Sequence, residues 1–473
     1  MINIVTDKSF ILNVELVWEY LEENNNLSKN IFRVFQGKTS QLFYNPFNEV
    51  PTLFIGLGKK EDIDFITIKE IFAKISKQLK KMDTKECTID ISELYKKYES
   101  SMICHAIEGL ILGGYKYTKE KKSNELNCEI NLYGIKESEI ESSEAIIKET
   151  TSLMKSVIFA RNTVNCPGNK LRPHDFVNEI TEFMKDVDVE VQVLDYEKLK
   201  EVKMDALLAV GDSSEFKPYL VIVRYKGDKE SEENFGLIGK GVTCDTGGYC
   251  LKPSNSMAGI RGDMAGAASV IGAIHALAHN KIKTNATAIV PICENRISDS
   301  SLLVGDVISS YSGKTIEILN TDAEGRLILA DAVSYGLRNE KITKVLDIAT
   351  LTGAVVNLLG FSIGGVMCDD EDLFNCFEKA YNHTKERYLR LPFYKEHEEM
   401  LKSDVADIKN LGKSHCGTLT AGLFIREFAE GTPWIHIDIA GTAWTEPPIF
   451  EYQSKGATGA GVTTIYELCK GDI

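Results

Sequence analysis

The sequence contains no apolar stretch long enough to cross a membrane, and it begins without the pattern of a secretory signal. A membrane helix needs about 18 or more consecutive apolar residues, and no window of the 473 residues approaches that length. Residues 1–8 lack the charged segment followed by an apolar segment that signal peptides share. We therefore expect a cytoplasmic protein that has no membrane partner.

Positive charge is also in short supply. The chain has 54 Lys and Arg residues against 69 Asp and Glu residues, which gives a formal net charge of −15. A protein with this balance repels the phosphate backbone, so nucleic acid is not an expected partner. The surplus of carboxylates has a second use, because hard divalent cations prefer oxygen ligands.

The 11 cysteines do not form the pattern of a disulfide framework or of a zinc site. Their number is odd, no two are spaced as CxxC, and the closest pair, Cys244 and Cys250, has an unusual spacing for zinc ligands. Free thiols in a protein of a reducing compartment are the simplest interpretation.

Several catalytic motifs are missing as well. The spacing around Gly239 does not fit a P-loop, and Cys244 stands where a dinucleotide-binding fingerprint needs glycine. His275 and His279 have helical spacing but lack the glutamate of a zincin, and no Gly-x-Ser-x-Gly elbow follows a predicted strand. These absences argue against nucleotide-binding proteins, zincins and serine hydrolases.

The length and the alternation of apolar and charged stretches predict a two-domain α/β protein. In residues 1–160 we expect a smaller N-terminal three-layer α/β domain that ends in a linker helix over residues 140–160. In residues 161–473 we expect a larger C-terminal α/β/α catalytic domain with a mostly parallel central sheet. The strands predicted in this second domain cover residues 219–224, 235–240, 286–292, 344–350 and 434–439, and its clearest helices cover 264–279 and 326–338.

Charged residues gather in two short segments near predicted strands. One is residues 320–327, where Asp322, Glu324 and Arg326 occupy alternate positions. In an extended segment these side chains point to one side, and a divalent cation would offset the cost of burying the two carboxylates together. A solvated loop with acidic residues at a helix start explains this segment equally well when it is taken alone.

The other segment is residues 239–254, which Asp263 extends at a predicted helix start. Lys240 and Asp245 follow a predicted strand at its carboxyl end, where open α/β sheets place their ligands. Each residue has an ordinary alternative role, such as a helix cap for Asp263 or an exposed position for Lys252. Two lysines and four carboxylates gathered at strand ends nevertheless favour a metal centre.

With these residues in view, the sequence resembles the leucyl aminopeptidase (cytosol aminopeptidase) family. Residues 320–327, Asn-Thr-Asp-Ala-Glu-Gly-Arg-Leu, are similar to the family's signature octapeptide without a substitution. The upstream residues that match the family's spacing are Lys240, Asp245, Lys252 and Asp263. The resemblance extends over about residues 150–470 and includes residues 162–167, 349–354 and 436–444.

The resemblance implies a metal-dependent exopeptidase that removes unblocked N-terminal amino acids, with a leucine-type preference. It implies two divalent ions per subunit, Mn²⁺ or Zn²⁺. The tighter ion would be held by Lys240, Asp245, Asp263 and Glu324, and the more exchangeable one by Asp245, Asp322 and Glu324. Lys252 and Arg326 would occupy the two catalytic positions, with a bicarbonate ion at Arg326. Relatives are usually hexamers, so the resemblance also implies a homohexamer that serves intracellular peptide turnover.

The residue types suit this chemistry. Two cations roughly 3.5–4 Å apart can share one water and lower its pKa. Lys240 can ligate only as a neutral amine, which costs about 5 kcal/mol relative to a free lysine at neutral pH. Lys252 would stay charged and stabilise the developing oxyanion, whereas Arg326 keeps its proton and cannot act as the base.

Three departures from the family pattern bear on the leucine preference but leave the metal set intact. Phenylalanine is usual where Cys244 stands, methionine is frequent at the position of Ile260, and residues 294–306 lack the usual composition.

Two other functions remain open from the residues alone. A two-metal phosphoesterase would have a similar carboxylate cluster, although such sites commonly add histidines and none of the eight lies in either charged segment. A non-catalytic DNA-binding or metal-stabilised structural relative is disfavoured by the acidic charge.

Overall fold

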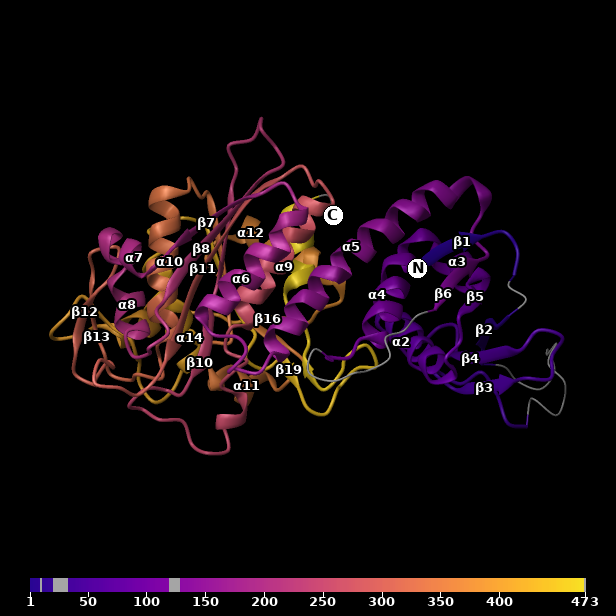
Figure 1. Cartoon of the computed structure of the whole chain (residues 1–473), viewed down its shortest axis with the longest axis horizontal. Helices are drawn as coiled ribbons and strands as arrows, with labels where there is room; N and C mark the ends of the chain where they lie inside the picture. The colour runs from indigo at the N-terminus through magenta and orange to yellow at the C-terminus, as the bar shows by residue number, and fades with distance from the viewer. Residues whose placement is uncertain (9–10, 20–32, 119–127, 472–473) are drawn as a thin grey trace. The chain divides into compact units, whose positions relative to one another are not determined.

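The computed structural model describes residues 1–8, 11–19, 33–118 and 128–471. The chain forms two compact units, of which the first contains Met1–Lys155 with Pro447–Ser454 and the second contains Ser156–Glu446 with Lys455–Ile473. Both units combine helices with a largely parallel sheet (Figure 1), which confirms the predicted fold class. Helix α5 (Ile140–Asn165) runs across the division. The domain boundaries 1–160 and 161–473 stay a prediction of where the chain separates into independently folding parts.

The first unit is built on a six-stranded sheet with the order β1-β6-β5-β2-β4-β3. Its strands are β1 (Ile2–Val5), β2 (Asn13–Trp18), β3 (Leu42–Asn45), β4 (Thr52–Gly58), β5 (Glu86–Asp90) and β6 (Glu129–Tyr133). Only the β3/β4 pair among them is antiparallel. Helices α2 (Phe65–Met82) and α4 (Ile103–Gly114) pack closely, because Gly109 and Gly113 of α4 approach the backbone of α2 where a Cβ would not fit.

The second unit contains a nine-stranded sheet with the order β16-β15-β18-β14-β9-β11-β8-β7, and β10 pairs with β11 beside this path. Its strands are β7 (Glu190–Leu194), β8 (Tyr219–Lys226), β9 (Phe235–Gly239), β10 (Gly241–Asp245), β11 (Asn285–Asn295), β14 (Lys344–Ala349), β15 (Gly364–Cys368), β16 (Tyr388–Arg390) and β18 (Trp434–Asp438). The central strands β11, β9, β14 and β18 run parallel. Their carboxyl ends therefore meet at one edge, the edge at which such sheets bind ligands.

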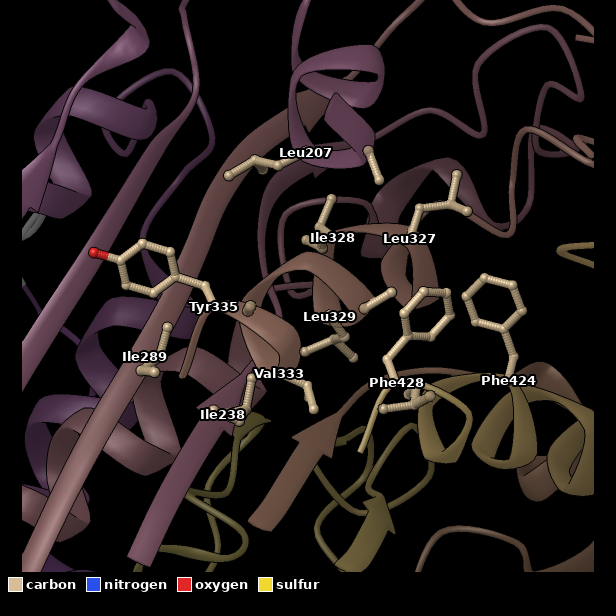
Figure 2. Packing of buried hydrophobic residues seen from close by; sticks show 14 of the residues in the cluster. Leu207, Ile238, Ile289, Leu327, Ile328, Leu329, Val333, Tyr335, Phe424 and Phe428 are labelled. Carbon is tan, nitrogen blue, oxygen red and sulfur yellow. The ribbon is translucent and has the colours of Figure 1, made fainter. Parts of the chain in front are cut away.

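Helices cover both faces of this sheet, as Figure 1 shows. One face carries α9 (Ala265–His279), α12 (Glu371–Thr384) and α15 (Val462–Lys470), and the other carries α8 (Asp205–Gly211), α10 (Gly325–Asn339) and α14 (Gly417–Arg426). Figure 2 shows the core under α10, where Leu329 and Val333 pack with Ile238, Ile289 and Phe428. The helices predicted at 264–279 and 326–338 are thus confirmed as α9 and α10, which lie on opposite faces of the central strands.

The helices of the described ranges include none that combines the length and the apolar character of a membrane span.

A buried ion pair lies inside the second sheet. Asp347 of β14 and His436 of β18 are register partners, and Asp347 Oδ1 lies 2.5 Å from His436 Nδ1. Trp434 Nε1 donates a hydrogen bond to the other carboxylate oxygen at 2.8 Å. Burial alone would lower the pKa of His436, but attraction to Asp347 outweighs this and raises it above the ordinary 6.5. The imidazole of His436 is therefore protonated more readily in the folded protein than as a free side chain.

The substitution Asp347→Asn is expected to lower the free energy of unfolding by about 3–5 kcal/mol, because it leaves the imidazole without its buried partner. Since the folded pKa of His436 is raised, the contribution is complete below pH 6.5 and is lost as the pH rises through the folded value. Denaturation followed by tryptophan fluorescence at about pH 6 and at about pH 9 measures this difference. His174→Gln is the control, since its 3.1 Å pair with Asp175 is exposed and should contribute under about 1 kcal/mol. A loss of equal size at both pH values would contradict the assignment.

Candidate metal centre

The first charged segment begins where β9 ends. The amide of Lys240 donates to Ile348 O at 3.2 Å, and its carbonyl accepts from Ala267 N at 2.9 Å. Strand β14 and the start of α9 therefore converge on the backbone of Lys240. Its side chain is only 4% exposed, so this ammonium group lies inside the unit and not on its surface.

Asp245 is the last residue of β10 and is almost fully buried. Its Oδ1 accepts hydrogen bonds from Gly247 N at 2.9 Å and from Asn295 Nδ2 at 3.0 Å. The chain then turns through Gly247 and Gly248, whose φ angles of 87° and 60° favour glycine. A Cβ on Gly247 would lie 2.9 Å from Asp322 Oδ1. The turn thus brings the first charged segment against the second.

The second charged segment forms a turn that leads into α10. The expectation of an extended segment with three side chains on one side is wrong, because Asp322 lies in the turn, Glu324 is the N-cap of α10 and Arg326 is in its first helical turn. Asp322 and Glu324 still come together with Asp245, since one carboxylate oxygen of each lies within 4.8 Å of the others.

Lys240 lies between two carboxylates. Its Nζ is 2.7 Å from Asp263 Oδ2 and 3.0 Å from Glu324 Oε1. A Cβ at position 325 would lie 2.6 Å from this Nζ, so Gly325 permits the approach. Burial alone would lower the pKa of Lys240, but attraction to Asp263 and then to Glu324 raises it.

Lys252 lies in the same way between Asp245 and Asp322. Its Nζ is 2.7 Å from Asp245 Oδ2 and forms an ion pair with Asp322. Burial alone would lower the pKa of Lys252, but attraction to Asp245 and then to Glu324 raises it, so the side chain is charged at neutral pH. The side chain of Lys252 is 22% exposed against 4% for Lys240. Lys252 is therefore the lysine that a molecule from solvent can reach.

The carboxylates are arranged as cation ligands would be. Burial raises the pKa of Asp263 and of Glu324, and the nearby charge of Asp245 adds to both shifts. Asp263 Oδ2 and Glu324 Oε1 are buried, and the ammonium of Lys240 lies 2.7 Å and 3.0 Å from them. Buried carboxylate oxygens need such a positive charge, and a divalent cation could supply it in the same place. Carboxylates with one amine suit ions such as Mn²⁺ or Zn²⁺.

Arg326 lies in the first turn of α10, two residues after Glu324 of this cluster. Its Nη1 donates to Asn410 O at 2.8 Å, while its Nε is buried without a hydrogen-bond partner among the residues that the structure describes. Burial lowers the pKa of Arg326 to about 10, which still leaves it cationic at neutral pH. A buried guanidinium with a free donor fits a small anion such as bicarbonate.

Sequence reasoning missed two asparagines. Asn295, at the carboxyl end of β11, donates to Asp245. Asn410 is fully buried, and its Oδ1 accepts from Leu319 N at 2.8 Å while its Nδ2 donates to Asn320 O at 2.7 Å. The position of Asn295 at a strand end was a usable signal, because the charged residues share that edge. Asn410 lies about 90 positions from its partners and offers no such signal.

Two residues at the departures from the family pattern, Cys244 and Glu294, are buried. Cys244 precedes Asp245 in β10, and its register partner in β11 is Glu294. Glu294 forms ion pairs with Arg172 at 2.9 Å and with Arg296 at 2.5 Å. The unusual composition at 294–296 thus forms a satisfied ion-pair network beside the centre.

The family model described as "Cytosol aminopeptidase family, catalytic domain" matches residues 158–466. The model described as "Cytosol aminopeptidase family, N-terminal domain" matches residues 33–124. Both charged segments lie within the first of these matches.

Relatives that align over nearly the whole chain include two proteins named "Probable cytosol aminopeptidase". The one from Clostridium perfringens (strain 13 / Type A) is 37% identical over 488 residues and covers 99% of each chain. The one from Treponema denticola is 39% identical over 439 residues and covers 92% of each chain. A similar solved structure is "Bottromycin maturation enzyme BotP in complex with Mn", with a TM-score of 0.89, 28% identity and coverage of 98% of this chain and 99% of that one.

Proposed function

Because this chain belongs to the cytosol aminopeptidase family, we propose that it releases unblocked N-terminal amino acids, with a leucine-type preference, by means of a water activated by two divalent cations. It is a metal-dependent aminopeptidase and therefore a hydrolase of peptide bonds. The proposal adds the number of ions, the residues that hold them and the preference for leucine.

The observation that carries the proposal is the convergence of three carboxylates from two segments, with oxygens of Asp245, Asp322 and Glu324 within 4.8 Å of one another. In the proposed assignment one ion would be held by Lys240, Asp245, Asp263 and Glu324. The other would be held by Asp245, Asp322 and Glu324. When bound, the ions would lower the pKa of a shared water, polarise the first peptide carbonyl and provide a position for the neutral α-amine of the substrate.

The residues that hold no ion have separate roles. The ammonium of Lys252 would donate to the substrate carbonyl oxygen as negative charge develops on it, which is the interaction that stabilises such transition states. The unpartnered Nε of Arg326 supports a bicarbonate ion beside the cluster. That anion would accept the proton of the attacking water, because Arg326 itself does not release one.

The test compares a Leu- or Met-initiated peptide with its N-acetylated form. We expect the free peptide to be hydrolysed, and the acetylated one to react on the order of 10²-fold more slowly because the α-amine contributes about 3 kcal/mol of binding to the ions. A chelator should abolish both activities, and Mn²⁺ or Zn²⁺ should restore them. Equal cleavage of the two peptides would refute the exopeptidase assignment, and release of phosphate from a phosphomonoester would favour the phosphoesterase alternative.

The remaining features rest on the family alone. We propose a cytoplasmic homohexamer with a role in intracellular peptide turnover. Measurement of the mass in solution by light scattering tests the assembly, and a panel of peptides that differ only in the first residue tests the leucine preference.

A further inference from the structure

Asn295 occupies a central place among the charged side chains. Its Nδ2 lies 3.0 Å from Asp245 Oδ1, 3.0 Å from Thr321 O and 3.5 Å from Glu324 Oε2. All three neighbours are acceptors, which fixes the orientation of the carboxamide, because only its NH₂ group can face them. Asn295 is 5% exposed, so water does not compete for these contacts.

The backbone of Asn295 contacts the first charged segment, and its side chain contacts the second. Asn295 is the register partner of Asp245 in the β10/β11 pair, and its carbonyl accepts from Thr246 N at 2.9 Å and from Thr246 Oγ1 at 2.9 Å. Through Thr321 O, its side chain also holds the turn that precedes Glu324. One residue at the end of a central strand therefore fixes both charged segments.

The other contacts form two similar halves, each with one ammonium group between two carboxylates. In one half, the ammonium of Lys240 lies between Asp263 and Glu324. In the other half, the ammonium of Lys252 lies between Asp245 and Asp322. Asn295 joins the halves because it reaches Glu324 in the first and Asp245 in the second. These two carboxylates are the ones that both ion sites share in the proposed assignment.

We propose that Asn295 is a positioning residue that couples the two ion sites. Like charges on Asp245 and Glu324 repel, and the NH₂ group of Asn295 holds them at a fixed separation from the rigid end of β11. The first ion then meets carboxylates that are already oriented, and it leaves them oriented for the second ion. This positioning role rests on the proposed two-ion function. None of the predicted site residues has such a role.

The test removes the donors in two ways. Asn295→Ala deletes the carboxamide, and Asn295→Leu keeps about the same volume but supplies no N–H. The matched control is Asn285→Ala, at the opposite end of the same strand, where Asn285 Nδ2 donates to Ser231 O and Glu233 O at 3.1 Å each. The control also loses two hydrogen bonds at an end of β11, but this end is only partly buried and lies ten residues along the strand from Asn295.

Mn²⁺ is titrated calorimetrically into the metal-free protein, and thermal unfolding of the metal-free protein is recorded beside it. We expect the Kd of the weaker ion to rise about 10–100-fold in both Asn295 variants, as is typical when partners of metal ligands are removed. The control should bind Mn²⁺ as the wild type does. At saturating Mn²⁺ the variants should recover kcat in part, with KM for the peptide little changed.

The outcomes separate the two proposals. Fewer than two ions on the wild-type protein would refute the two-ion function and the coupling with it. Two ions on the wild type with wild-type Kd values in both Asn295 variants would overturn the positioning role alone. An equal weakening in Asn285→Ala would also overturn it, because the effect would then come from loss of strand stability.

Discussion

Replacement of Glu324 by glutamine is expected to lower kcat/KM for an unblocked peptide by on the order of 10³-fold, which corresponds to about 4 kcal/mol of lost transition-state stabilisation. Glu324 contacts both Lys240 and Asn295. One of its carboxylate oxygens also lies within 4.8 Å of oxygens of Asp245 and Asp322. Glutamine keeps the shape but removes the negative charge and one ligand oxygen from both proposed ion sites. Activity assays at several Mn²⁺ concentrations, with metal content measured on the same samples, test this.

Asp299→Asn is the control for that substitution, because Asp299 is an exposed carboxylate on the loop that follows β11. It should retain full activity and metal content. If Glu324→Gln keeps two ions and loses less than about tenfold in kcat/KM, Glu324 does not serve both sites as proposed.

The second large effect is expected from Lys252→Met. Methionine keeps most of the side-chain length without the charge, and loss of a single oxyanion donor typically lowers kcat by about 10²–10³-fold. The structure adds a further expectation for ion binding. Lys252 now neutralises Asp245 and Asp322, so its removal takes away a competing positive charge. The affinity for Mn²⁺ should stay equal or rise while kcat falls.

A fall in kcat without a loss of ion affinity separates a catalytic role of Lys252 from a structural one. Lys402→Met is the control, because Lys402 pairs with Glu399 on the surface with 71% of its side chain exposed. A fall in kcat that is accompanied by loss of the ions would show that Lys252 holds the site together and does not act on the substrate.

The central strands and flanking helices could be predicted because their signals are local. Strand β9 was expected over 235–240 and ends at Gly239, and α10 was expected over 326–338 and covers Gly325–Asn339. Helix α5 was expected to end near residue 160 but continues to Asn165. The first helix-breaking residues after the start of α5 are Pro167 and Gly168, which follow Asn165. The positions of such residues decide where a helix ends.

Other features depend on partners that are distant in the chain. Residues 447–454 belong to the first unit, where Lys77 Nζ pairs with Glu451 Oε2 at 2.8 Å and Lys69 lies over the ring of Tyr452 at 5.1 Å. No local pattern in that segment indicates this partner. The buried pair of Asp347 and His436 was missed for the same reason, since its members are 89 positions apart.

The sequence by itself determined the family of this chain and, with the family, a metal-dependent aminopeptidase activity. The signature octapeptide and the upstream lysines and aspartates are short, local patterns, and charges beside glycines at strand ends indicate a metal centre before any fold is known. Only the tertiary structure decided the geometry: which carboxylates share neighbours, that Lys240 is enclosed while Lys252 is accessible, and that Asn295 and Asn410 hold the charged segments in place. The physical reason is that a hydrogen-bond partner is chosen by distance in space, and the parallel sheet brings together strand ends that the chain keeps far apart.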